Sequence, residues 1–142
     1  ALYLQMGEAA LAIADFSAAI ALEPAHMPSF HNRGLAELKI GWIDKAIADF
    51  SVAIGLEPTA QAFNNRGVAH KTAGNDAASI RDFTEAIRMN PGYASAFNNR
   101  GEAHERAGQR REALADFRAA VACKPGYAVA QYNLARLTAL LK

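Results

Sequence analysis

The sequence predicts an all-α fold in which antiparallel helix pairs stack side by side into a solenoid. Three patterns recur along the 142 residues, with spacings of 34, 33 and 34. They are an Asp-Phe dipeptide beginning at Asp15, Asp49, Asp82 and Asp116, a proline nine residues after each aspartate, and a glycine eight residues before it. Self-similarity at this period indicates repeats that bury their apolar faces only by stacking on their neighbours.

Each repeat predicts a first helix with one packing face. These helices are expected at residues 27–40, 61–73 and 94–107. Phe30, Gly34 and Glu37 share a face at i, i+4 and i+7, and the same positions hold Phe63, Gly67 and His70, then Phe97, Gly101 and His104. Since a glycine inside a helix costs about 0.5–1 kcal/mol relative to alanine, its recurrence predicts a close approach by the next helix. The small residues expected opposite it are Ala46, Ser79 and Ala113.

The second helix of each repeat carries an apolar stripe, which in one copy consists of Ala46, Ile47, Phe50, Ala53 and Ile54. A proline is placed to end each second helix. The recurring glycines, Gly41, Gly74 and Gly108, are placed to end the first helices in the left-handed conformation.

Both ends of the chain predict half-repeats. Residues 1–26 are expected to hold the tail of a first helix, which stops at Gly7, followed by its partner helix. Residues 127–142 predict a lone first helix. Its Leu137, Leu140 and Leu141 could cap the stack, await a further helix or pair with another chain. Because the pattern is already under way at Ala1, the chain is expected to be a fragment.

Composition argues against several classes of protein. The 15 Lys+Arg balance 14 Asp+Glu, so no strong field favours nucleic acid or an anionic membrane. The single cysteine, Cys123, excludes an internal disulfide and is expected to be a packing residue. No apolar run reaches the roughly 18–20 residues of a membrane span, and no secretory signal is visible. The cellular location is left open, with the cytoplasm favoured.

With these features the sequence resembles the tetratricopeptide repeat (TPR) family over essentially its whole length. The unit of that family, about 34 residues long, has a large residue, a glycine four later, a turn glycine, alanine, an aromatic residue, alanine and proline. Here these are Phe30, Gly34, Gly41, Ala46, Phe50, Ala53 and Pro58. The resemblance implies one TPR domain with a right-handed superhelix, divided into residues 1–26, 27–59, 60–92, 93–126 and 127–142.

One asparagine per repeat leads to the functional prediction. Asn32, Asn65, Asn99 and Asn133 lie two residues past the packing position, about 200° round the helix, and so point away from the packed face. In the TPR family that face lines a concave groove, where members such as the O-linked N-acetylglucosamine transferases hold an extended peptide with a ladder of asparagines. The resemblance implies that these four residues, called the asparagine ladder below, bond a peptide backbone. The alternative is that duplicated repeats have kept a polar helix surface.

The variable groove positions are expected to set selectivity. They are Pro28, Gln61 and Ser95 at the rim, His31, Asn64, Asn98 and Tyr132 on the floor, and Lys71, Glu102, Glu105 and Arg106 further along. TPR domains that clamp the carboxylate of chaperone tails need lysine on the floor of one repeat and a Lys/Arg pair two repeats on. Because His31 and Asn64 occupy the early floor positions here, the sequence argues against chaperone-tail binding.

A second polar residue recurs beside the packed face. Arg33, Arg66 and Arg100 stand where the family usually has leucine, as this chain does at Leu134. A guanidinium beside a core needs an acid, so we expect pairs with the recurring aspartates that fix the geometry of the repeat. The sequence leaves open whether the aspartate belongs to the same or the preceding repeat. The alternative is that both side chains reach solvent.

The sequence therefore predicts a non-catalytic scaffold that binds an extended peptide segment of another protein. No cofactor, metal, nucleic acid or membrane partner is expected, because no metal-ligand cluster, phosphate-binding loop or nucleophile–base grouping appears. His70 and His104 are expected to pack between helices rather than bind metal. One alternative is single-stranded RNA binding, which the period and charge balance argue against. Another is an idle groove, with weak self-association through the convex face or the terminal helix.

Overall fold

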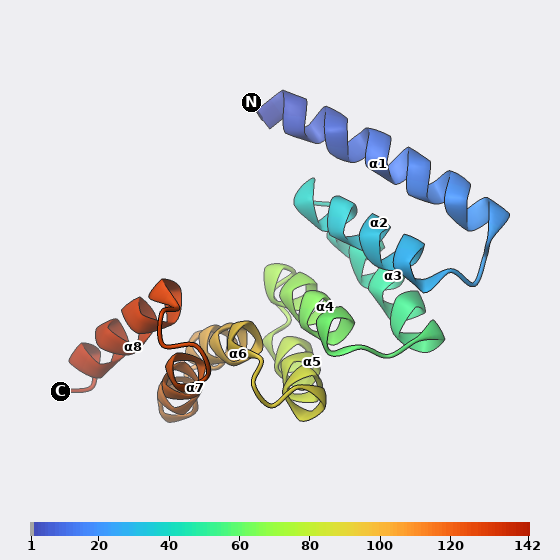
Figure 1. Cartoon of the computed structure of the whole chain (residues 1–142). Helices are drawn as coiled ribbons and strands as arrows, with labels where there is room; N and C mark the ends of the chain where they lie inside the picture. The colour runs from blue at the N-terminus through green and yellow to red at the C-terminus, as the bar shows by residue number, and fades with distance from the viewer. Residues whose placement is uncertain (1) are drawn as a thin grey trace.

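The chain is folded almost entirely into helices. The computed structural model describes residues 2–142, with side chains described from residue 5 onward. This part of the chain forms eight α-helices and no strand (Figure 1). They are α1 (Leu2–Leu22), α2 (Met27–Lys39), α3 (Ile43–Leu56), α4 (Ala60–Thr72), α5 (Asp76–Met89), α6 (Ala94–Arg106), α7 (Arg110–Cys123) and α8 (Ala128–Leu140). The all-α prediction is confirmed, and the first helices α2, α4 and α6 match their predicted bounds to within one residue.

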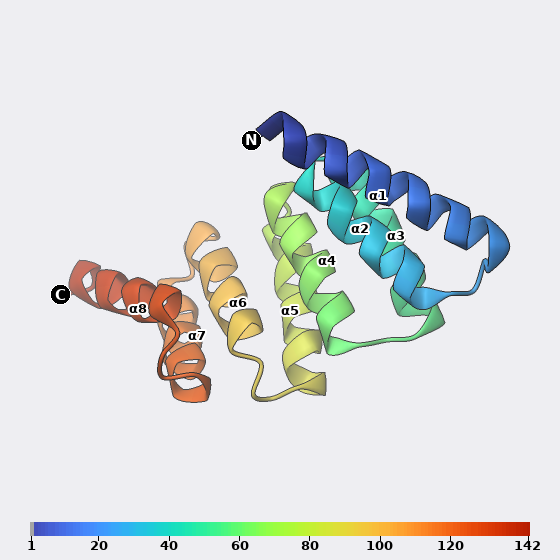
Figure 2. The same ribbon diagram turned by 45° about the horizontal axis from the view of Figure 1, so that its top comes forward.

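The helices stack in the order of the chain. Each helix contacts the next one, and α2 also contacts α4 as α4 contacts α6, which places the first helices of successive repeats side by side. The chain runs from α1 at one end of the stack to α8 at the other (Figures 1 and 2). This arrangement is the repeat solenoid that the sequence predicts.

Three glycines end the first helices as predicted. Gly41, Gly74 and Gly108 have φ of 85°, 84° and 81°, and no other described residue has a positive φ. After Gly41 the Trp42 N–H donates to the Glu37 carbonyl at 2.8 Å, which closes the last turn of α2. Only glycine adopts this left-handed conformation without strain, so the turn between the helices of a repeat is set locally.

The N-terminal half-repeat differs from the prediction. α1 continues from Leu2 to Leu22, straight through Gly7, instead of stopping there as the sequence predicts. A Cβ at Gly7 would meet nothing within 4 Å, but the same holds at the turn glycines Gly41, Gly74 and Gly108, so local space does not explain the difference. The chain keeps its helical hydrogen bonds through Gly7 at the modest cost of a mid-helix glycine.

α1 also corrects the prediction about membrane-spanning segments. Its window Gln5–Leu22 is long and apolar enough, by length and composition alone, to cross a membrane. The sequence prediction considered uninterrupted apolar runs, which Glu8 and Asp15 break, whereas the alanines between them raise the mean hydropathy. Core helices of other proteins pass the same test, so the expectation of no membrane partner stays a prediction.

The close approach predicted at the mid-helix glycines is confirmed, but against a different partner. A Cβ at Gly34 would lie 2.8 Å from the Phe50 ring, and one at Gly67 or Gly101 would lie 2.6 Å from the equivalent phenylalanine. The partner is therefore the aromatic ring and not the small residue one turn earlier, which was predicted. Phe50, with Phe83 and Phe117 in the later repeats, is fully buried. Glycine leaves the room that each ring needs.

The terminal helix α8 divides its predicted leucines between core and surface. Leu137 is fully buried against Ala113 and Phe117 of α7. Leu140 and Leu141 remain 61% and 44% exposed. Leu137 thus closes the core of the last complete repeat, and the other two leucines lie outside that contact.

Candidate functional site

The asparagine ladder runs along successive first helices, but its four members do not lie in equivalent surroundings. Asn32 on α2 is exposed, Asn65 and Asn99 on α4 and α6 are half-buried, and Asn133 on α8 is buried. The row thus becomes more enclosed toward the C-terminal end of the stack. Burial alone does not test the prediction that all four amides point into one open groove. The hydrogen bonds of these amides show what each one contacts.

Three of the four amides form hydrogen bonds to the preceding first helix. Asn65 Nδ2 lies 3.1 Å from His31 Nε2. Asn99 Nδ2 donates to Asn64 Oδ1 at 3.2 Å, and Asn133 Nδ2 donates to Asn98 Oδ1 at 3.1 Å.

Each bond joins a ladder residue to the predicted floor residue of the repeat before it. The ladder therefore contributes to holding repeats together, a role that the sequence analysis missed. An asparagine amide has two N–H donors and a carbonyl acceptor. Asn65 and Asn99 each use one donor in these bonds, so their second donor and their oxygen remain for other partners. Asn133 Nδ2 also lies 3.4 Å from Glu102 Oε1.

His31 has an incomplete set of hydrogen bonds. An amide nitrogen only donates, so His31 Nε2 accepts the bond from Asn65 and the proton of the neutral ring lies on Nδ1. Nδ1 is buried and has no partner among the described residues. Burial lowers the pKa of His31, which keeps the ring neutral near pH 7. A buried donor without a partner costs about 1–3 kcal/mol.

A cavity of about 260 Å³ lies at this end of the groove. Residues of the first turns of α2 and α4 line it: Met27, Pro28, His31, Asn32, Thr59 and Gln61. Thr59 is the N-cap of α4, and its hydroxyl accepts the Ala62 N–H at 3.1 Å. These lining residues include no Asp, Glu, Lys or Arg. They include both His31, whose Nδ1 has no partner, and Asn32, the exposed member of the asparagine ladder.

The charged groove positions lie further along and are paired with one another. Lys71 on α4 forms an ion pair with Glu102 on α6. Arg136 on α8 holds Glu105 through two bonds of 2.8 and 2.6 Å. These pairs link neighbouring first helices, so the residues predicted to select a ligand also connect the repeats.

Two further asparagines, Asn98 and Asn133, are hydrogen-bonded to Glu102. Asn98 Nδ2 donates to Glu102 Oε1 at 3.2 Å, and Asn133 Nδ2 approaches the same oxygen at 3.4 Å. Arg106 donates to the Lys71 carbonyl at 2.8 Å. The polar groups of α6 and α8 are thus largely occupied within the fold.

The predicted Arg–Asp pairs are confirmed, and each lies within one repeat. Arg33 donates from Nε and Nη2 to the two oxygens of Asp49 at 2.6 and 2.8 Å. Arg66 with Asp82 and Arg100 with Asp116 repeat this two-bond geometry at 2.7–2.8 Å. Burial raises the pKa of Asp49, but hydrogen bonds from Arg33 and Glu37 outweigh it and hold that pKa below its ordinary value.

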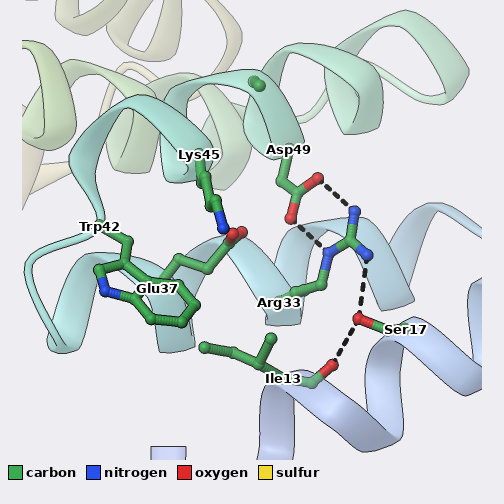
Figure 3. A pocket seen from close by; sticks show the side chains of 8 residues that line it. Ile13, Ser17, Arg33, Glu37, Trp42, Lys45 and Asp49 are labelled. Atoms are coloured by element: carbon green, nitrogen blue, oxygen red, sulfur yellow. Dashed lines mark hydrogen bonds and ion pairs between the residues drawn. The ribbon is translucent and has the colours of Figure 1, made fainter. Parts of the chain in front are cut away.

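The arginines have a third partner that the sequence analysis missed. Arg33 Nη1 also donates to Ser17 Oγ of the preceding helix at 3.1 Å (Figure 3). The equivalent partners of Arg66 and Arg100 are Ser51 and Thr84. A hydroxyl two residues after each aspartate is the signal that could have found them. In the last repeat, where Leu134 replaces arginine, that position holds Arg118 instead.

A second cavity of about 360 Å³ opens between α1, α2 and α3. Figure 3 shows Ile13, Trp42 and Lys45 around it, together with the Arg33–Asp49 pair. Burial, with a hydrogen bond to Asp49, raises the pKa of Glu37 to about 8. Glu37 is therefore mostly protonated at neutral pH, although its Oε1 is buried without a partner.

His70 and His104 occupy the position in the later repeats that Glu37 has in the first, and they lie beside the Arg–Asp pairs of those repeats. His70 Nε2 is 3.8 Å from Asp82, and His104 Nε2 is 3.7 Å from Asp116. This agrees with the predicted packing role between helices. Among the described residues no group of three or more His, Cys, Asp or Glu side chains could hold a metal ion. Cys123 is exposed, so its predicted role as a packing residue is wrong.

The fold defines a helical-repeat protein whose successive first helices are linked by polar side chains. The model of the tetratricopeptide repeat family matches residues 2–61, 31–94 and 64–128, so the chain belongs to this family. A comparison with curated protein sequences found no match.

Solved structures of TPR proteins share the fold. The crystal structure of MamA superposes with a TM-score of 0.83 at 21% identity, covering 88% of this chain and 74% of MamA. The TPR domain of Arabidopsis OM64 gives 0.77 at 27% identity, covering 79% and 93%. The second TPR domain of human RPAP3, solved in complex with an HSP70 peptide, gives 0.73 at 27% identity, covering 77% and 92%.

Proposed function

We propose that this chain is a protein-interaction scaffold that binds an extended segment of a partner protein along its first helices. The observation that carries the proposal is the asparagine ladder, one amide on each of α2, α4, α6 and α8. The amides of Asn65 and Asn99 each keep one N–H donor and the oxygen, which can bond a peptide C=O and N–H. Backbone bonding of this kind tolerates many partner sequences.

Two further observations support a groove for peptides. The RPAP3 domain, which is similar in fold and 27% identical, is solved with a peptide bound. In this chain a cavity lies beside Asn32, between the N-terminal parts of α2 and α4. The proposal assigns no catalytic role to the chain, in keeping with a family whose members act mainly as interaction modules.

The expected affinity is moderate. A net hydrogen bond contributes about 0.5–1.5 kcal/mol, so one bond at each of four residues supplies roughly 2–6 kcal/mol. Ordering a flexible ligand offsets part of this gain, whereas side-chain contacts add to it. Such a balance suits a reversible complex in the micromolar range.

The test is a screen of this chain against an array of ten-residue peptides, compared with the Asn65→Ala/Asn99→Ala double variant. We expect the double variant to lose most of the binding, because it removes two backbone contacts. Arg111→Ala is the matched control, since Arg111 is exposed on the second helix α7. Thermal melting of both variants separates lost binding from lost folding. Equal binding by the double variant and the parent would discard the asparagine ladder as the binding element.

One observation favours self-association as a second candidate function. Four large residues of the C-terminal segment are strongly exposed, namely Val129, Tyr132, Leu140 and Leu141. Sedimentation velocity at several concentrations tests this candidate. If the chain is a monomer at every concentration, and Leu140→Ser does not change its sedimentation, self-association is ruled out as a function.

A further inference from the structure

We infer that the N-terminal half of the groove, formed by α2 and α4, holds the peptide, and that it selects an uncharged segment with a large apolar side chain. This inference rests on the proposed function, because it concerns the same groove. It differs in saying that the four members of the asparagine ladder are not equal. Asn32 and Asn65 act as ligand contacts, and Asn99 and Asn133 act as links between repeats.

The first argument is what lies beside each asparagine. The residue three positions on shares the same helix face. It is Leu35 after Asn32 and Val68 after Asn65. Leu35 is 38% exposed, so the N-terminal half offers the groove an accessible apolar surface.

The same position in the C-terminal half is charged. Glu102 follows Asn99 by three residues and Arg136 follows Asn133. Each is paired to the neighbouring first helix, Glu102 with Lys71 and Arg136 with Glu105. A peptide charge in this half would have to displace a partner already in place.

The second argument is the hydrogen-bonding state of the amides. Each bonded ladder residue donates a hydrogen bond to the floor residue of the preceding first helix, as Asn99 does to Asn64. No hydrogen bond of the Asn32 amide is found among the described residues. Asn32 is also the exposed member of the ladder, so a ligand peptide group can reach its amide.

The third argument is the cavity beside Asn32. Its volume of about 260 Å³ suits one large side chain, and its wall includes the apolar residues Met27 and Pro28. His31 lines the same cavity and has a buried Nδ1 without a partner. Because the lining has no charged residue, an acidic or basic side chain would enter without compensation.

These features together describe the ligand. It is an internal segment of a partner protein, because the described residues that line the cavity include no Lys or Arg to bind a terminal carboxylate. Its backbone bonds Asn32, and one large apolar side chain enters the cavity beside it. A further apolar side chain contacts Leu35 and Val68.

The experiment uses three sets of N-acetylated, C-amidated ten-residue peptides with equal leucine content. The sets differ only in whether the remaining positions are uncharged, acidic or basic. We expect the uncharged set to bind best. Asn32→Ala should weaken that binding about five- to tenfold, as expected for the loss of one or two hydrogen bonds. Asn99→Ala, the same substitution at the same phase of α6, should weaken it less than twofold.

Leu35→Ser provides a second variant whose folding is not at issue, because Leu35 is partly exposed. It should also weaken binding of the uncharged set. Spectra of ¹⁵N-labelled protein give an independent readout, in which the side-chain amide of Asn32 and the ring N–H of His31 shift on titration.

The outcomes separate the two proposals. Equal or better binding of a charged set, or equal losses for Asn32→Ala and Asn99→Ala, would overturn the inference and leave the proposed function standing. Binding by none of the three sets, or binding that no ladder substitution changes, would overturn the proposed function and the inference with it.

Discussion

Two rows of polar residues run the length of the stack, and the fold uses them to different extents. In the arginine row, which comprises Arg33, Arg66 and Arg100, every guanidinium holds both oxygens of a buried aspartate and reaches a hydroxyl of the preceding helix. In the asparagine ladder Asn65 and Asn99 each have one donor occupied by the preceding first helix and keep the rest, whereas Asn133 also approaches Glu102.

The difference teaches how to interpret a recurring polar residue. A charge beside a core must be neutralised within the fold, because desolvation would otherwise outweigh any gain. A neutral amide on an accessible face carries no such requirement, so it can link repeats and still bond a ligand. Recurrence alone does not separate these roles, whereas the charge of the side chain and the partners it bonds do.

The largest expected effect is in the arginine row. Arg66→Ala should lower the free energy of unfolding by about 3 kcal/mol, because it leaves the buried Asp82 without its cation. Arg66→Leu should lower it less, since leucine refills the apolar space, as Leu134 does in the last repeat. Chemical denaturation measures both. A greater loss for leucine than for alanine would show that the pair is not a structural one.

A smaller effect is expected in the asparagine ladder. Asn99→Ala should lower the free energy of unfolding by about 0.5–1.5 kcal/mol, because it removes one neutral hydrogen bond to Asn64. Asn32→Ala is the matched control and should change stability little, as its amide links no repeats. Thermal melts of the two variants compare them directly. Similar losses in both would mean that the bond to Asn64 contributes nothing.

A dependence on pH is expected to distinguish the first Arg–Asp pair from the later ones. The pKa of Glu37 is raised to about 8 in the folded chain, from an ordinary value of 4.5. The folded state therefore binds more protons between these values, and stability falls as the pH rises from about 5 to 8.

His70, at the same phase of the next repeat, gives the opposite sign. Burial lowers its pKa below 6.5, so the unfolded state binds more protons and stability falls as the pH drops below that value. Glu37→Gln should remove the loss of stability above pH 5 and leave the loss at acid pH. Denaturation curves at pH 5, 7 and 8.5 measure this. An unchanged slope in the variant would assign the alkaline loss to another group.

Much of the architecture follows from local patterns. The turn at Gly41 and a close approach at Gly34 follow from the sequence, because helical periodicity fixes which residues share a face, although the ring that approaches Gly34, Phe50, does not. The Arg–Asp pairing also follows, since a cation beside a core has few acceptable partners. The continuity of α1 through Gly7 could not be predicted, because the same glycine ends a helix or lies inside it depending on what packs nearby.

The functional residues divide in the same way. By itself the sequence determined the repeat, the bounds of the first helices α2, α4 and α6, and the recurrence of one asparagine in each repeat. Only the tertiary structure decided that Arg33 pairs within its own repeat and that Asn99 bonds Asn64. The physical reason is that periodicity specifies directions around one helix, whereas hydrogen bonds depend on the distance between helices, which the packing of the whole stack sets.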